Sequence, residues 1–80
     1  MFGKGRARAI EQTGSWVRRI EEHLGILETE PGDEARAHHV VEVVGWIAEV
    51  RSNLRHMGVR TGREWEQRVD EWERRLNRVR

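Results

Sequence analysis

The 80-residue chain has no cysteine and no tyrosine, one proline, and no long hydrophobic run. The absence of cysteine excludes disulfide bonds and thiolate metal sites, and it fits a reducing compartment. Because no stretch of 18 apolar residues and no signal-peptide core is present, we expect a cytoplasmic protein without membrane contact. Lys4 is the single lysine, whereas the chain has fourteen arginines. The net charge is only +1, because fourteen acidic residues balance the basic ones. Such interleaved charge does not favour a protein that coats a polyanion.

Groups typical of catalytic sites are also missing. There is no glycine-rich phosphate loop and no cysteine nucleophile, and neither Ser15 nor Ser52 lies in a recognisable nucleophile motif. Neighbouring carboxylates such as Glu21 and Glu22 diverge on a helix rather than converge on a substrate. We therefore predict that the protein is not an enzyme and needs no cofactor.

What the sequence does contain is helical periodicity. Apolar residues spaced alternately by three and four from Ile10 to Leu27 predict a first helix over about 6–24. Gly25 is a typical residue just beyond a helix end, so we expect 25–33 to be a loop.

Two further helices are expected after that loop. An acidic start and a basic end, both favourable to the helix dipole, predict a second helix over about 33–57. Thr61 and Glu64 match a T-x-x-E capping box, which predicts a third helix over about 62–79. The linker between the two is short, so the third helix should return beside the second.

The predicted organisation is one small domain, residues 1–80, with a basic arm over 1–6. A chain of this size buries only about 60% of the surface that it exposes when unfolded, so its core is marginal. The second helix carries an apolar arc of roughly 220°, from Trp46 round to Val41, which is wider than one neighbouring helix would cover. The fold class predicted is all-α: a three-helix bundle with a long central helix, completed by a homodimer. Alternatively, the other two helices cover the whole arc.

The function favoured by these features is a non-enzymatic protein–protein interaction module. It would be an adaptor, an inhibitor or a regulatory subunit, a kind of small protein that phages and plasmids encode. No residue motif assigns it to one family. Its partners would be a second copy of itself and an unidentified protein, and half-buried tryptophans are typical of such interfaces. The predicted interface comprises Trp16, Val40, Val41, Val44, Trp46, Ile47 and Arg51.

A nucleic-acid-associated protein is the first alternative. A basic arm and a group of arginines near the second turn could bind phosphates. These residues are Lys4, Arg6, Arg8, Arg51, Arg55 and Arg60. However, the third helix begins with glutamates, and acid–base pairs four residues apart, such as Glu71 and Arg75, are typical of a solvated helix. Sequence-specific DNA reading is therefore disfavoured.

A metal-binding helical protein is the second alternative. Glu34, His38 and Glu42 lie four residues apart on one side of the second helix, and imidazole with carboxylate can bind zinc or another divalent ion. A solvated polar stripe is the simpler interpretation. We expect His39 to pack partly buried at the apolar edge and His23 to lie on an exposed face without a role.

Overall fold

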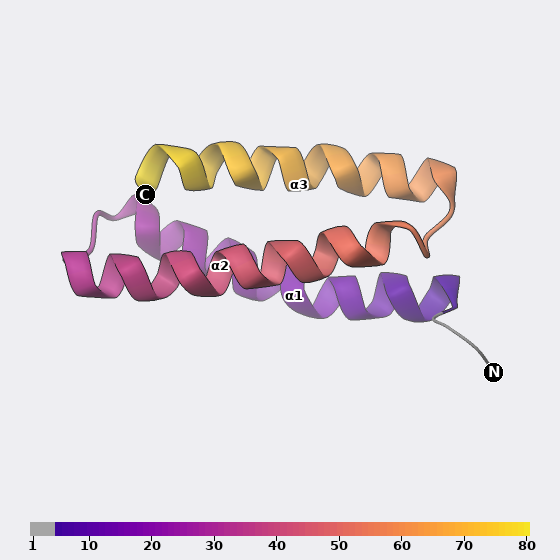
Figure 1. Cartoon of the computed structure of the whole chain (residues 1–80), viewed down its shortest axis with the longest axis horizontal. Coiled ribbons are helices and arrows are strands. Elements are labelled where there is room, and N and C mark those ends of the chain that lie inside the picture. Colours follow the sequence, from indigo (N-terminus) through magenta and orange to yellow (C-terminus); the bar gives the residue numbers. More distant parts are fainter. Residues whose placement is uncertain (1–4) are drawn as a thin grey trace.

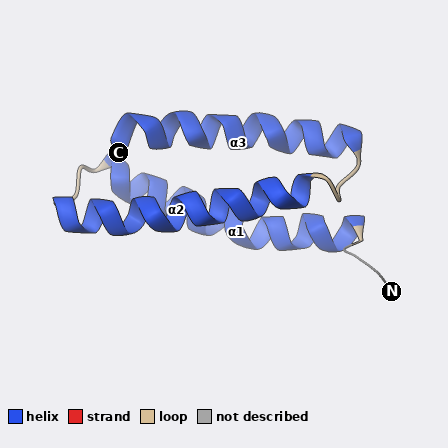
Figure 2. Cartoon of the chain, in the orientation of Figure 1, coloured by secondary structure: helices blue, strands red, loops and turns tan. Residues whose placement is uncertain are grey.

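The computed structural model describes residues 5–80 and contains three α-helices. They are α1 (Arg6–Glu28), α2 (Asp33–Leu54) and α3 (Val59–Val79), and the described part of the chain has no strand (Figures 1 and 2). The molecule is elongated, 45 × 22 × 14 Å. Consecutive helices run antiparallel, so the start of α1 lies at the same end as the α2–α3 turn (Figure 1). The predicted all-α three-helix bundle is confirmed.

The first helix is longer than predicted. It continues through Gly25 to Glu28, and the connection to α2 is only 29–32. Thr29 ends the helix, its hydroxyl donating a hydrogen bond of 2.6 Å to the Ile26 carbonyl. The extra turn buries Leu27 almost completely. Burying a leucine side chain contributes about 2 kcal/mol, which outweighs the roughly 1 kcal/mol that a glycine costs inside a helix.

The predicted ends of the other two helices are also wrong at the α2–α3 turn. α2 ends at Leu54, and α3 begins at Val59, so Thr61 lies inside the helix rather than capping it. Gly58 occupies the cap position with φ 88° and ψ 162°, a conformation essentially restricted to glycine. Gly62 is buried where α3 passes α2, and a Cβ there would lie 3.2 Å from the Leu54 carbonyl oxygen. This close approach fixes the turn, and the capping-box pattern has no part in it.

The core lies along the line where the three helices meet. Its buried members are Ile20, Leu24, Leu27, Val43, Ile47, Val50, Val69, Trp72 and Leu76. Each helix supplies residues spaced by three and four, as expected from the periodicity. In α2 only a narrow stripe is buried, so α1 and α3 cover only part of its apolar arc.

One polar pair is fully buried between α1 and α2. The side-chain amide of Asn53 donates a hydrogen bond of 3.4 Å to the Thr13 hydroxyl. The helix α1 is continuous through Thr13, Gly14 and Ser15. Because a buried amide needs partners, this pair favours one register of the two helices over others.

We expect Gly58→Ala to lower the free energy of unfolding by about 1–3 kcal/mol, because alanine is strained at this backbone conformation. The new Cβ would also lie 3.1 Å from the guanidinium of Arg6. Gly14→Ala is the matched control: Gly14 lies in an exposed helix interior with open space around it, so this change should stabilise by up to about 1 kcal/mol. Urea unfolding followed by circular dichroism measures both, and equal stability of Gly58→Ala and wild type would contradict the strain.

Candidate functional site

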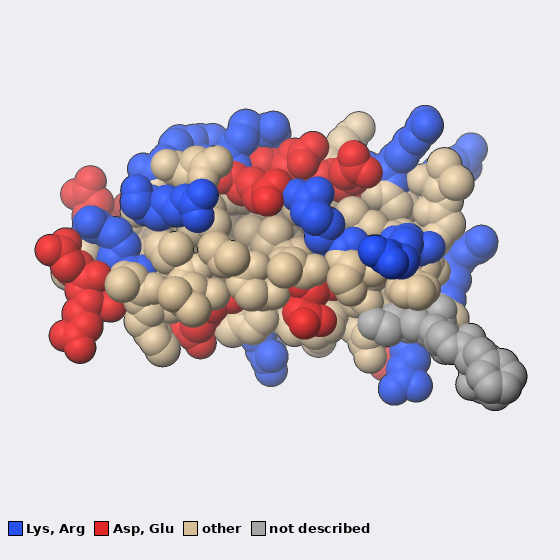
Figure 3. Space-filling view, in the orientation of Figure 1, with Lys and Arg blue, Asp and Glu red and all other residues tan. Residues whose placement is uncertain are grey.

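The first candidate site is an exposed face of α2, most of which neither α1 nor α3 covers. Six residues spaced 3-4-3-4-3 form it, and we call them the α2 face: Glu34, Ala37, Val41, Val44, Ala48 and Arg51. All six are exposed, and the two valines at its centre keep 71% and 44% of their surface. In the space-filling view an uncharged band runs along the middle of the molecule (Figure 3). Val41 and Val44 are thus the part of the broad apolar arc that residues 5–80 leave uncovered.

The predicted interface residues fall into three groups. Val41 and Val44 are exposed at the centre of the α2 face, and Arg51 lies at its end, bound to Glu73 of α3. Ile47 is buried in the core and is only 4% exposed. The remaining three residues are half-buried and pack against the core: Trp16, Val40 and Trp46.

A shallow groove between α2 and α3 adjoins the α2 face. Its apolar lining comes from Val44, Ile47, Ala48 and Leu76. Polar side chains stand around that lining: Arg51, Glu73, Asn77 and Arg80. The groove extends the apolar surface of the α2 face toward α3, so a helix lying on α2 could contact both.

The second candidate site joins α1 to α2 on another side of the bundle. His23 comes from α1, and His38, His39 and Glu42 come from α2; we call these four residues the histidine–glutamate cluster. Glu42 Oε1 lies 3.1 Å from His38 Nε2, 3.7 Å from His23 Nε2 and 3.7 Å from His39 Nδ1. One carboxylate oxygen therefore faces three imidazole nitrogens from two helices.

Neighbouring groups fix the orientation of the rings in the cluster. His23 Nδ1 lies 2.8 Å from the Arg19 carbonyl oxygen, and because a carbonyl only accepts, Nδ1 must carry the hydrogen. In the neutral ring the unprotonated Nε2 is then the nitrogen that faces Glu42. His23 also contacts the rings of Trp46 and His39 edge-on, at centroid distances of 4.7 and 4.9 Å. His39 Nδ1 is buried and has no hydrogen-bond partner among residues 5–80.

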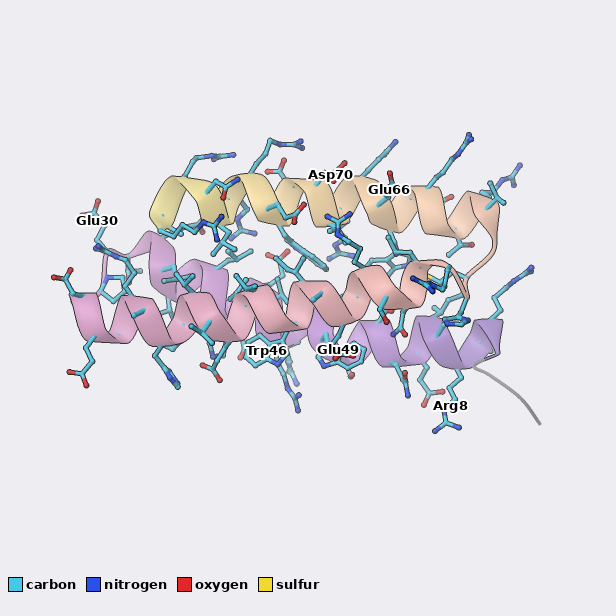
Figure 4. The ribbon with its side chains drawn as sticks, viewed as in Figure 1. Arg8, Glu30, Trp46, Glu49, Glu66 and Asp70 are labelled. Atoms are coloured by element: carbon cyan, nitrogen blue, oxygen red, sulfur yellow. The ribbon has the colours of Figure 1, made fainter. Side chains whose placement is uncertain are left out.

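The structure brings together only part of the metal-site residues predicted from sequence. His38 and Glu42 are in the cluster, whereas Glu34 belongs to the α2 face. His23 and His39 were not proposed as ligands, although both approach Glu42. The side chains of Trp46 and Glu49 emerge on one edge of α2 (Figure 4). A local i,i+4 pattern on α2 gave no indication of the residue that α1 supplies.

The residues predicted to bind nucleic acid do not share one direction. The structure describes Arg6, Arg8, Arg51, Arg55 and Arg60, whereas Lys4 and the rest of residues 1–4 lie outside the described residues. The guanidinium of Arg6 approaches Gly58 at the α2–α3 turn, and Arg51 is bound to Glu73. Arg8 points away from α2 and α3 (Figure 4). A nucleic-acid backbone bound along one face of the molecule would therefore contact only some of these arginines.

Arg75 joins α3 to α1 through two carboxylates. Its Nε and Nη2 donate to Glu28 at 2.9 and 2.8 Å, and its Nη1 donates to Glu21 at 2.8 Å. Trp72 Nε1 also donates to Glu21. The sequence had paired Arg75 with Glu71, and this pairing is wrong: Glu71 instead binds Arg74 at 2.8 Å, because Arg75 faces α1.

These hydrogen bonds favour the charged forms of Glu21, Glu28 and Arg75. Partial burial would by itself raise the pKa of Glu21, but hydrogen bonds from Arg75 and Trp72 outweigh it and hold that pKa below its usual value. Hydrogen bonds from Arg75 lower the pKa of Glu28, and the same bonds raise the pKa of Arg75. Carboxylates held in the ionised form are poor proton donors near neutral pH, so the network is suited to holding helices together rather than to acid catalysis.

We expect Arg75→Met to lower the free energy of unfolding at pH 7 by about 1–2 kcal/mol. Solvent screens part of the attraction, since the Glu21 and Glu28 side chains are 40% and 39% exposed. Both pKa values are lowered in the folded chain, so their stabilisation is present above the ordinary carboxyl value of 4.5 and is lost as the pH falls below it.

The difference between wild type and Arg75→Met should therefore shrink in acid. Thermal unfolding between pH 7 and pH 3 tests this. Arg74→Met is the control, because Arg74 binds Glu71 on its own exposed helix surface and should matter little at any pH. If the stability difference between wild type and Arg75→Met stayed constant down to pH 3, the stabilisation by Arg75 would not come from its ionised carboxylate partners.

No protein-family model, curated protein or solved structure matches the chain. Among residues 5–80, no helix combines the length and the apolar character needed to cross a membrane.

Proposed function

We propose that the chain is a non-enzymatic interaction protein that works as an antiparallel homodimer, packed through the α2 face. The observation that supports this is the symmetry of that face. Its residues read E-A-V-V-A-R, and their spacing, 3-4-3-4-3, is the same in both directions. A two-fold axis between Val41 and Val44 makes such a face complementary to itself.

The apolar part of the face is suited to close helix packing. Across the axis, each Val41 would meet Val44 of the second copy, and each Ala37 would meet Ala48 of the second copy. A seam with this spacing is the one that pairs helices in coiled coils, and small residues let the two backbones approach. Gly45, beside the seam, has open space where a Cβ would stand, so it adds no obstacle within the chain.

The charges at the two ends of the face favour the antiparallel arrangement. α2 begins with Asp33 and Glu34 and ends with Arg51 in its last turn. Antiparallel packing places Glu34 of one copy beside Arg51 of the other, whereas parallel packing would place like charges together. Arg51 binds Glu73 through Nη2, and a guanidinium has further N–H groups to donate.

A dimer of this kind leaves the outer surfaces of α1 and α3 free in two symmetric copies. This arrangement supports an adaptor or regulatory subunit, which would present each of those surfaces twice to a further protein partner. A single pair of helices buries less than the roughly 1,000 Å² typical of a stable interface. We therefore expect a dissociation constant in roughly the micromolar range.

Sedimentation equilibrium across micromolar concentrations tests the dimer. Wild type should approach twice the chain mass, and Val41→Glu should remain monomeric, because it places two buried charges at the centre of the seam. Val59→Glu is the matched control: Val59 is 76% exposed, close to the 71% of Val41, but it lies on α3 outside the α2 face. The proposed interface would be refuted if the wild type stayed monomeric at every concentration. It would also be refuted if Val41→Glu and Val59→Glu weakened the dimer equally.

Charge reversal tests the antiparallel direction separately. Glu34→Arg should weaken the dimer about three- to ten-fold by opposing Arg51 of the second copy, and Arg51→Glu should do the same. The double variant restores unlike pairs across the axis and should recover much of the affinity. Melting temperatures serve as the control, because Arg51→Glu also loses its bond to Glu73. Failure of the double variant to recover, with melting unchanged, would contradict antiparallel packing.

A further inference from the structure

We propose that the histidine–glutamate cluster is a binding site for a divalent transition-metal ion of the Zn²⁺ type, with His23, His39 and Glu42 as ligands. The exposed His38 lies beside the same carboxylate, on the open side of the site. This inference is independent of the proposed homodimer, since all these residues belong to one chain and lie outside the α2 face.

The spacing of the donor atoms fits a metal ion. His23, His39 and Glu42 each offer one atom, and these atoms all lie within 4.8 Å of one another. Zinc bonds of about 2.0–2.1 Å in a tetrahedron place neighbouring ligand atoms roughly 3.4 Å apart. The distances from Glu42 Oε1 to His23 Nε2 and His39 Nδ1 are both 3.7 Å, so rotations within the side-chain rotamers would complete the coordination.

The hydrogen-bonding state of the two rings also points to a cation. His23 donates Nδ1–H to the Arg19 carbonyl, which leaves the lone pair of Nε2 facing the Glu42 carboxylate. This outer hydrogen bond to a backbone carbonyl is the kind that orients metal-ligating histidines. The His39 side chain is only 20% exposed, and the described part of the chain offers its buried Nδ1 no hydrogen-bond partner. A metal ion placed among the three groups would be bound by one ring nitrogen of each histidine and by Glu42 Oε1, which also lies 3.1 Å from His38 Nε2.

The donor types indicate which ions the site would take. Two imidazole nitrogens and one carboxylate oxygen are the ligands of zinc and its neighbours in the transition series, whereas Mg²⁺ and Ca²⁺ prefer oxygen alone. Trp46 packs against His23 and covers one side of the cluster. The open side near His38 leaves room for a fourth ligand.

A bound ion would tie the end of α1 to the start of α2. His23 lies on α1 and the other two ligands lie on α2, so the ion would join helices that the chain connects only through 29–32. Because it binds the folded arrangement, it should raise the melting temperature with increasing metal concentration.

Calorimetric titration of the EDTA-treated full chain, without a histidine tag, tests the site with ZnCl₂. We expect one Zn²⁺ per chain, and His23→Gln and His39→Gln should each weaken binding ten-fold or more. His56→Gln is the control, because His56 is the one histidine outside the cluster and should leave binding unchanged. Circular dichroism establishes that each variant is folded, and Co²⁺ in place of Zn²⁺ should show the intense visible bands of a tetrahedral site.

Several results would overturn the assignment. They are the absence of heat and of any rise in melting temperature with Zn²⁺, unchanged affinity in folded His39→Gln, and loss of binding in His56→Gln. A stoichiometry of one ion for two chains would indicate surface histidines that bridge copies instead. Val41→Glu should bind zinc as wild type does, so a failure of the dimer and a failure of the metal site can be told apart.

Discussion

The four-residue connection between α1 and α2 fixes the register of the two helices, and most other contacts depend on that register. The antiparallel packing of α1 against α2 places His23 beside His39 and Glu42. The same register brings Thr13 and Asn53 together in the interior. A shift by one helical turn would separate both pairs and leave a buried amide without its hydroxyl.

α2 then has three differently occupied sides. One side packs against α1 and carries the histidine–glutamate cluster at its edge. Another packs against α3, where Arg51 and Glu73 form an ion pair. The third side is the α2 face, which two neighbours cannot reach because helices pack along narrow stripes. The apolar surface of α2 is thus wider than α1 and α3 together cover. The homodimer proposal rests on the part that stays exposed.

The sequence predicted the three helices and most of their buried positions, because periodicity reports which side of a helix is buried. Ile10, at the start of the first predicted stripe, is exposed instead. The sequence also indicated that α2 is apolar over too wide an arc. It failed at the helix ends, where Gly25 and Thr61 resemble local stop and start signals but tertiary packing overrides both.

The wrong helix end predicted at Gly25 also affected the prediction of the candidate site. A loop over 25–33 would have placed His23 opposite a different part of α2, so its approach to Glu42 could not be foreseen. Arg75 shows the same limit: its spacing from Glu71 suggested a local pair, while its actual partners, Glu21 and Glu28, lie on another helix. Pairing across helices depends on a register that local patterns do not contain.

The short connections also bear on how the chain folds. Most contacts join helices adjacent in sequence, a topology that folds in microseconds to milliseconds. The hydrogen bonds that join α3 to α1 are exceptions: those from Arg75 to Glu28 and Glu21 span 47 and 54 residues, and that from Trp72 to Glu21 spans 51. We therefore expect the α1–α2 hairpin to form first and α3 to dock onto it afterwards. The ion pairs of Arg75 would form last and would be the first to open when the molecule unfolds.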